Sequence, residues 1–251
     1  MTQPPIHICP NPAAIAEAVA RCWAALSATA IAERGLFHVA LAGGSTPRLL
    51  YQTLASPAWR DDIDWSRIHV FFGDERSVPP DHPDSNFRMA RESLLDHVPI
   101  PTDQIHRMKG EQHPLETAAA AYADCLEMLL PRSKQGAPCF DLILLGLGTD
   151  GHIASLFPGT AILHERERWV APVYVDKLHT WRLSLTFPVL NQARHVLLLV
   201  AGDTKRPIVK AVLAGEGGEP RYPVQMIQPQ GELAWYLDEA AAPDLPPSIR
   251  P

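Results

Sequence analysis

Residues 140–159 read FDLILLGLGTDGHIASLFPG, and this stretch decides the fold. Its apolar run, Leu142 to Leu145, ends at a glycine and predicts a strand buried on both faces, as strands of parallel sheets are. A glycine-rich loop follows, and it carries an acid, Asp150, and a histidine, His152. Ligands of open α/β sheets bind just beyond the carboxyl ends of the strands. The loop therefore has the position of an active site, and its histidine can titrate near neutral pH.

The glycine spacing of this loop also matches the dinucleotide-binding pattern G-x-G-x-x-G, with Asp176 as a possible ribose ligand further on. That interpretation requires a crossover helix directly after Gly151. Pro158 and Gly159 end any such helix within about two turns, and the charged run at 164–168 has no apolar stripe. The sequence therefore argues against nicotinamide binding.

Composition points to one α/β domain over residues 1–251, with 46 % hydrophobic and 20 % charged residues. A net charge of −6 argues against general nucleic-acid binding, so an anionic ligand must be held by local cations. The four cysteines form no C-x-x-C pair, so neither a zinc site nor a disulfide framework is suggested. With nicotinamide binding disfavoured, we expect no cofactor. We see no signal pattern and no apolar run near about 18 residues, and therefore expect a cytoplasmic protein without a membrane partner.

Strand and helix patterns alternate along the chain. Apolar runs predict strands at 37–42, 68–72, 169–175, 182–185, 196–201 and 233–237, the last of them at an edge. Helices are expected after Asn11-Pro12, after Thr46-Pro47 with Thr46 as cap, after Asp84 or Ser85, over 118–130, and from Asp203 as cap onward. Residues 243–251 are expected to form a frayed tail. The alternation predicts a doubly wound, mainly parallel sheet sandwiched by helices.

Four of these strand ends carry a polar or glycine-rich loop, at 43–47, 73–76, 146–152 and 202–205. The first loop, at a helix start, is typical of a phosphate cradle or simply of a tight turn. The second, taken alone, is typical of a solvated turn. In the fourth, Lys205 falls in the first turn of a helix, where the macrodipole disfavours a cation by about 0.3–1 kcal/mol. Because all four loops follow strands, we expect them to converge.

Taken together, these motifs resemble the family of 6-phosphogluconolactonases and glucosamine-6-phosphate deaminases, over nearly the whole chain. The markers are GGSTP at 43–47, FGDER at 72–76, VPPDHPDSN at 78–86, GLGTDGHIASLFP at 146–158, RLSLT at 182–186 and GDTK at 202–205. The resemblance implies a modified Rossmann-like fold of the sugar-phosphate isomerase type, without nucleotide or metal. It also implies hydrolysis of 6-phospho-D-glucono-1,5-lactone to 6-phospho-D-gluconate, the second step of the oxidative pentose phosphate pathway.

Lactone chemistry suggests roles for the residues in these motifs. We expect His152 to take the proton from the attacking water, with Asp74 and Asp150 as candidates to orient it. Arg76 or loop N–H groups can stabilise the charge on the carbonyl oxygen. The phosphate is expected on a cradle of Gly43, Gly44, Ser45 and Thr46, with Arg182 and Lys205 as cationic partners. A serine nucleophile, Ser45 or Ser155, is the rival mechanism, but neither lies in a G-x-S-x-G elbow.

Two other functions use the same scaffold, that of an amino-sugar deaminase and that of a sugar-phosphate sensor. The deaminases of the family carry a glutamate where this chain has Phe157, and that glutamate is thought to act in sugar-ring opening. A sugar-phosphate sensor would need an attached pair of DNA-binding helices, but the first helical pattern runs directly into the core pattern. Hydrolysis is therefore the expected activity, with a small sugar phosphate as the partner and a monomer or weak homodimer as the assembly.

Overall fold

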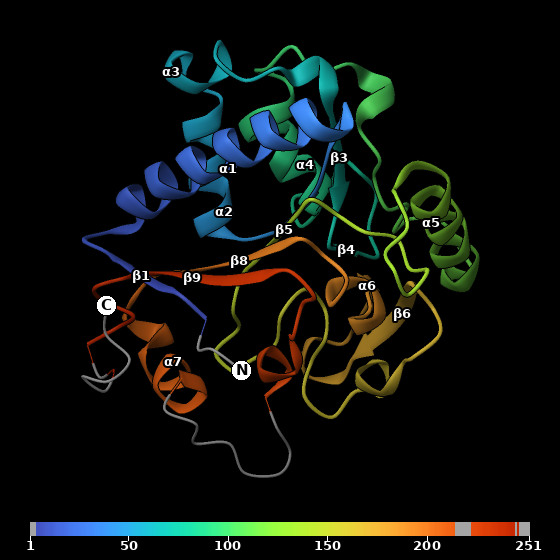
Figure 1. Cartoon of the computed structure of the whole chain (residues 1–251). Helices are drawn as coiled ribbons and strands as arrows, with labels where there is room; N and C mark the ends of the chain where they lie inside the picture. The colour runs from blue at the N-terminus through green and yellow to red at the C-terminus, as the bar shows by residue number, and fades with distance from the viewer. Residues whose placement is uncertain (1–3, 214–221, 244, 246–251) are drawn as a thin grey trace.

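The computed structural model describes residues 4–213, 222–243 and 245, and their strands form two sheets (Figure 1). The larger sheet has the order β1-β9-β8-β5-β2-β3, and every neighbouring pair is parallel. Its strands are β1 (Ile6–Cys9), β2 (Phe37–Leu41), β3 (Ile68–Phe72), β5 (Leu142–Leu145), β8 (His195–Val200) and β9 (Glu232–Asp238). The parallel α/β prediction is confirmed. The edge position predicted for 233–237 is wrong, because β1, which the sequence analysis missed, pairs outside β9.

The smaller sheet is antiparallel and has the order β4-β7-β6. Its strands are β4 (Asp74–Arg76), β6 (Val170–Val175) and β7 (Thr180–Leu185). The last two correspond to the strands expected at 169–175 and 182–185. They pair with the short, charged β4 instead of joining the main sheet.

The helices are α1 (Pro12–Arg34), α2 (Ser45–Leu54), α3 (Pro57–Arg60), α4 (Asn86–Ala90), α5 (Leu115–Leu129), α6 (Phe187–Leu190) and α7 (Arg206–Leu213). In Figure 1, α1 and α2 lie above the main sheet and α7 lies below it, whereas α5 packs against β6. Asn11 caps α1 and Ser85 caps α4, as predicted, by accepting hydrogen bonds from the N–H groups of Ala14 and Arg88.

Two predicted caps are wrong. Helix α2 begins at Ser45, and its N-cap is Gly44, two residues before the expected cap Thr46. Asp203 is not a cap either, since it opens the short 3₁₀ turn η6 (Asp203–Lys205), which follows Gly202 and leads into α7. In both places the glycine has a positive φ, 107° at Gly44 and 95° at Gly202, which glycine adopts without a Cβ penalty. The predicted tail, 243–251, lies almost wholly outside the described residues.

Helix α1 is long and apolar enough, by length and composition, to cross a membrane, which the sequence analysis did not anticipate. In the structure, however, it buries one face in the core, with Ile15, Val19 and Trp23 fully inaccessible, and it packs against α2 and β9. The same apolar content is therefore explained by its role as a core helix.

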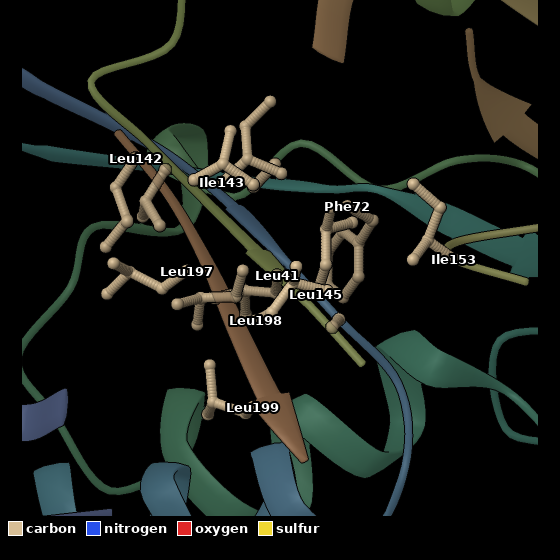
Figure 2. Close-up of a cluster of buried hydrophobic side chains, with 14 of the residues drawn as sticks. Leu41, Phe72, Leu142, Ile143, Leu145, Ile153, Leu197, Leu198 and Leu199 are labelled. Atoms are coloured by element: carbon tan, nitrogen blue, oxygen red, sulfur yellow. The ribbon is translucent and has the colours of Figure 1, made fainter. Parts of the chain in front are cut away.

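The main sheet aligns the ends of four strands. Leu41 of β2 pairs with Phe72 of β3, and Leu145 of β5 pairs with Leu198 of β8. Figure 2 shows the buried side chains around these strands; those labelled are Leu41, Phe72, Leu142, Ile143, Leu145, Ile153, Leu197, Leu198 and Leu199. Because parallel strands in this register end at one edge, the loops that follow them start close together.

The buried carboxylate of Glu75 holds the loop after β3 in place through hydrogen bonds. It accepts hydrogen bonds from Ser85 Oγ at 3.0 Å and from three backbone N–H groups, those of Arg76, Asn86 and Phe87, at 2.8, 2.7 and 2.9 Å. Burial raises the pKa of Glu75, and the hydrogen bonds to its ionised form oppose that rise. The alternative considered for this loop taken alone, a solvated turn, is therefore wrong, because a carboxylate can be buried when donors surround it.

We expect Glu75→Ala to lower the free energy of unfolding by about 2–4 kcal/mol, because it leaves several buried donors without an acceptor. Urea denaturation monitored by circular dichroism measures this change. Glu92→Ala, which removes an exposed carboxylate paired with Arg88, is the matched control and should change stability little. Equal changes in the free energy of unfolding for the two substitutions would contradict the role of Glu75 in stabilising the loop.

Candidate active site

The four loops predicted to converge do so, around a cavity of about 230 Å³. It is lined by nine of the ten residues proposed from the sequence, which are Gly43, Gly44, Ser45, Thr46, Asp74, Arg76, His152, Arg182 and Lys205. The tenth, Asp150, does not line the cavity and instead contacts His152. The structure therefore brings together residues that lie up to about 160 positions apart in the chain.

His152 is held through its Nδ1 atom, which lies 2.5 Å from Asp150 Oδ1. Burial would raise the pKa of Asp150, but hydrogen bonds from Lys177 and His152 outweigh it and hold that pKa at about 2. Asp150 is thus ionised near neutral pH, and Nδ1–H of His152 donates to it. This leaves Nε2 with the lone pair, so the ring can accept a proton there. Of the two aspartates considered from the sequence, Asp150 is the one that orients the ring.

The pKa of His152 is lowered, and burial is the main cause. The charge and hydrogen bond of Asp150 oppose that shift, and the charge of Lys177 reinforces it. The ring of Phe157 stacks on the imidazole, with centroids 4.0 Å apart and an angle of 26° between the planes. These contacts favour the neutral imidazole near pH 7, which is the form that a general base needs.

Asp74 is a second, more deeply buried carboxylate at the cavity. Its Oδ2 accepts a hydrogen bond from Ser155 Oγ at 2.6 Å, and its Oδ1 accepts one from Asn86 Nδ2 at 3.0 Å. Arg182 Nη1 lies 4.0 Å from the same Oδ2. These partners fix the carboxylate on the cavity wall, and none of its hydrogen bonds among the described residues goes to His152.

Three cationic side chains line the cavity. Arg76 of β4 lies directly opposite Arg182 of β7, and the Nε atoms of both are buried without a hydrogen-bond partner among the described residues. Burial lowers the pKa of Arg182, although the charge of Asp74 opposes this. Lys205 stands just before α7 in turn η6, and we find no salt bridge for it in the described part of the chain. Cationic side chains whose donors are not all satisfied, grouped around one cavity, favour an anionic ligand.

The first turn of α2 adds uncharged donors to these cations. Gly44 precedes it, and no side chain caps its N–H groups. The N–H groups of Ser45 and Thr46 therefore have no acceptor within the helix, which is the arrangement that binds phosphate at helix N-termini. Among residues 4–213, 222–243 and 245, no group of His, Cys, Asp and Glu is arranged to hold a metal ion.

Sequence reasoning missed several residues at this site. Lys177 contacts Asp150 from a turn between β6 and β7, and nothing in its local sequence distinguishes it from a surface lysine. Ser155 was considered only as a nucleophile, but it is fully buried and donates to Asp74. Asn86 lies inside a quoted motif, yet its bond to Asp74 depends on how the loop folds back.

A model of the family described as glucosamine-6-phosphate isomerases/6-phosphogluconolactonase matches residues 10–235. The chain belongs to this family. A 6-phosphogluconolactonase from Synechocystis sp. is 43 % identical over 244 residues, which cover 97 % of this chain and 99 % of the relative. One from Streptomyces coelicolor is 40 % identical, covering 94 % and 93 % of the two chains.

Solved structures agree with this assignment. The 6-phosphogluconolactonase of Trypanosoma brucei superposes with a TM-score of 0.86 at 29 % identity, covering 98 % of this chain and all of that one. A monomeric glucosamine-6-phosphate deaminase gives a TM-score of 0.79 at 21 % identity, which shows a shared fold only. The Rossmann-like fold of the sugar-phosphate isomerase type is thereby confirmed.

The position of the His152 ring depends on the missing side chain of Gly148. A Cβ atom there would lie 1.9 Å from His152 Nδ1 and 2.7 Å from Asp150 Oδ1. We expect Gly148→Ala to break the bond between them and to abolish the low-field NMR signal of the hydrogen-bonded Nδ1 proton. Gly73→Ala is the control, because its Cβ would only touch Leu41 O at 3.5 Å. An unchanged signal in Gly148→Ala would contradict this packing.

Proposed function

We propose that this protein hydrolyses 6-phospho-D-glucono-1,5-lactone to 6-phospho-D-gluconate, with His152 as the general base. The observation that carries the proposal is an imidazole held by Asp150 through Nδ1 in a small cavity lined by cations. The relatives named 6-phosphogluconolactonase, which match over nearly the whole chain, support the choice of substrate.

In the proposed reaction, Nε2 of His152 takes a proton from water as the water oxygen attacks the lactone carbonyl carbon. The imidazolium that forms is stabilised by the Asp150 carboxylate, which already accepts the Nδ1–H. The tetrahedral intermediate then collapses, the bond to the ring oxygen breaks, and the imidazolium returns the proton to that oxygen. The net change is the addition of one water molecule, and the neutral base is regenerated.

We assign the phosphate and the carbonyl oxygen of the substrate to different donors. The phosphate is placed on the first-turn N–H groups of α2, with Lys205 and Arg182 as cations. We assign Arg76, whose buried Nε–H has no partner among the described residues, to the carbonyl oxygen, where negative charge develops during attack. A fixed donor of this kind stabilises the transition state more than the ground state.

Water is a better nucleophile candidate than a serine in this cavity. Ser155 is fully buried, so it is not exposed to a ligand, and its hydroxyl donates to Asp74 and not to His152. Ser45 lines the cavity at the start of α2, where we assign it to the phosphate. Neither hydroxyl forms a described hydrogen bond with His152, which a serine mechanism would need.

Assembly and location are further expectations of the proposal. The large apolar side chains that are exposed among the described residues are Met128, Tyr174, Leu178 and Trp181. So few are insufficient for an extensive obligate interface, which supports a monomer or weak homodimer. Light scattering after gel filtration measures the oligomeric state.

A cytoplasmic location also stays a prediction, since some plant relatives are named chloroplastic.

We expect His152→Asn to lower kcat by about 10²–10⁴-fold, the usual contribution of a positioned general base. An asparagine can keep the hydrogen bond to Asp150 but cannot take a proton at neutral pH. The measurement is lactone hydrolysis above the spontaneous background, with circular dichroism to show that the fold is retained. Wild-type turnover in the folded variant would remove His152 from the mechanism.

We expect Lys205→Ala to raise KM for the 6-phosphate substrate by about ten- to hundredfold, because a charge-assisted contact to phosphate is lost. For gluconolactone without phosphate, the same substitution should change hydrolysis little. Steady-state kinetics with both substrates makes the comparison. If both substrates respond equally, Lys205 has no particular relation to the phosphate.

The protein should release no detectable ammonia from glucosamine 6-phosphate. The position that carries a glutamate in the deaminases is Phe157, whose ring stacks on His152 and cannot transfer a proton for sugar-ring opening. A coupled ammonia assay, run beside lactone hydrolysis, tests this. Deamination at a rate comparable to hydrolysis would overturn the proposed function.

A further inference from the structure

Four side chains beside the cavity form a closed cycle of contacts. His152 Nδ1 is bonded to one oxygen of Asp150, and Lys177 Nζ pairs with the other. The same Nζ lies 4.7 Å from the ring centroid of Phe157, on the ring that stacks on His152 with centroids 4.0 Å apart. Lys177 therefore contacts both groups that hold the imidazole, although it does not line the cavity itself.

We propose that Lys177 is a positioning residue that keeps His152 in place and in its neutral form. The proposal rests on the role of His152 as general base under the proposed function. Lys177 would act through Asp150 and Phe157, without touching the substrate. Its ammonium both shares the Asp150 carboxylate and holds the aromatic ring over the imidazole by a cation–π contact.

The charges around His152 show why a cation is needed there. Asp150 and Asp74 favour the imidazolium, whereas Lys177 disfavours it. Arg76, Arg182 and Lys205, which also line or face the cavity, add positive charge on the substrate side. With Asp150 alone as partner, the ring would bind a proton more tightly and would be protonated over more of the neutral range. A protonated ring cannot accept the proton of water.

The position of Lys177 is set by the small sheet. It lies in turn η5 (Asp176–Leu178), which joins β6 to β7 and ends at His179 with a left-handed φ of 47°. Strand β7 then carries Arg182, whose guanidinium carbon lies 6.0 Å from the Phe157 ring centroid. The same hairpin thus places two cations near Phe157, one toward Asp150 and one in the cavity.

Because Lys177 is partly exposed, its positioning role can be tested separately from folding stability. Its side chain is 50 % exposed, and half-exposed ion pairs contribute little to folding stability. A substitution at this position should therefore leave the thermal midpoint almost unchanged. A change in the pKa of His152 can then be measured in a variant whose fold is unchanged.

The test compares Lys177→Met and Lys177→Arg with Lys210→Met, an exposed lysine of α7, as the matched control. The pKa of His152 is measured by NMR titration of the ring protons, assigned with His152→Asn, and the pH profile of kcat/KM is recorded for each protein. In Lys177→Met, we expect the pKa of His152 to rise by about half a unit to one unit, because a nearby positive charge is lost.

The acid limb of the pH profile should move upward by the same amount. At pH values on the acid limb, kcat/KM should fall by about three- to tenfold. This factor is the decrease in the fraction of neutral His152 that a pKa rise of about half a unit to one unit causes. At high pH, KM should change by less than about twofold, since Lys177 does not line the cavity. Lys177→Arg should restore most of the wild-type behaviour, and Lys210→Met should match the wild type throughout.

An unchanged His152 titration in Lys177→Met would overturn the proposal, as would a rise in KM without a change in the pH profile. The NMR titration needs no substrate. If the wild type fails to hydrolyse the lactone but the titration of His152 still shifts, the proposed function falls and the relation between Lys177 and His152 stands.

Discussion

The parallel register of β2, β3, β5 and β8 is the constraint on which the rest of the structure depends. Buried backbone N–H and C=O groups must be paired, and in parallel strands that pairing brings the carboxyl ends to one edge. Everything at the cavity starts from this edge: the cradle after β2, the charged strand after β3, the histidine loop after β5 and Lys205 after β8. A shift in register would separate these groups.

The antiparallel sheet places charged side chains beside the apolar strands of the main sheet. Arg76 and Arg182 face each other across β4 and β7, although like charges placed opposite each other normally destabilise a strand pair. Asp74, lying near Arg182, offsets part of that repulsion, and Ser155 and Asn86 satisfy its oxygens. The remaining positive charge is directed into the cavity. An acidic protein with a net charge of −6 thereby presents a cationic site to an anionic ligand.

The two buried carboxylates of β4 have different roles, one in the structure of the loop and one at the cavity. Glu75 is surrounded by four donors and fastens the loop to the start of α4. Asp74, its neighbour in the chain, points to the opposite face of the strand and lines the cavity. Alternation along an extended strand thus allows one of two adjacent acids to stabilise the loop while the other lines the cavity.

The sequence by itself determined the α/β class, most of the parallel strands and the convergence of the four loops, because apolar runs and strand-end motifs are local signals. It also identified nine cavity-lining residues, through motifs that each lie within a few positions. Only the tertiary structure decided that Asp150 rather than Asp74 orients His152, that β1 forms the edge, and that Glu75 is buried. Lys177 is the clearest case: its local sequence resembles any surface turn, and its contact with Asp150 exists because the β6–β7 hairpin packs over a loop 27 residues away. Such contacts depend on the packing of distant segments, which no local pattern encodes.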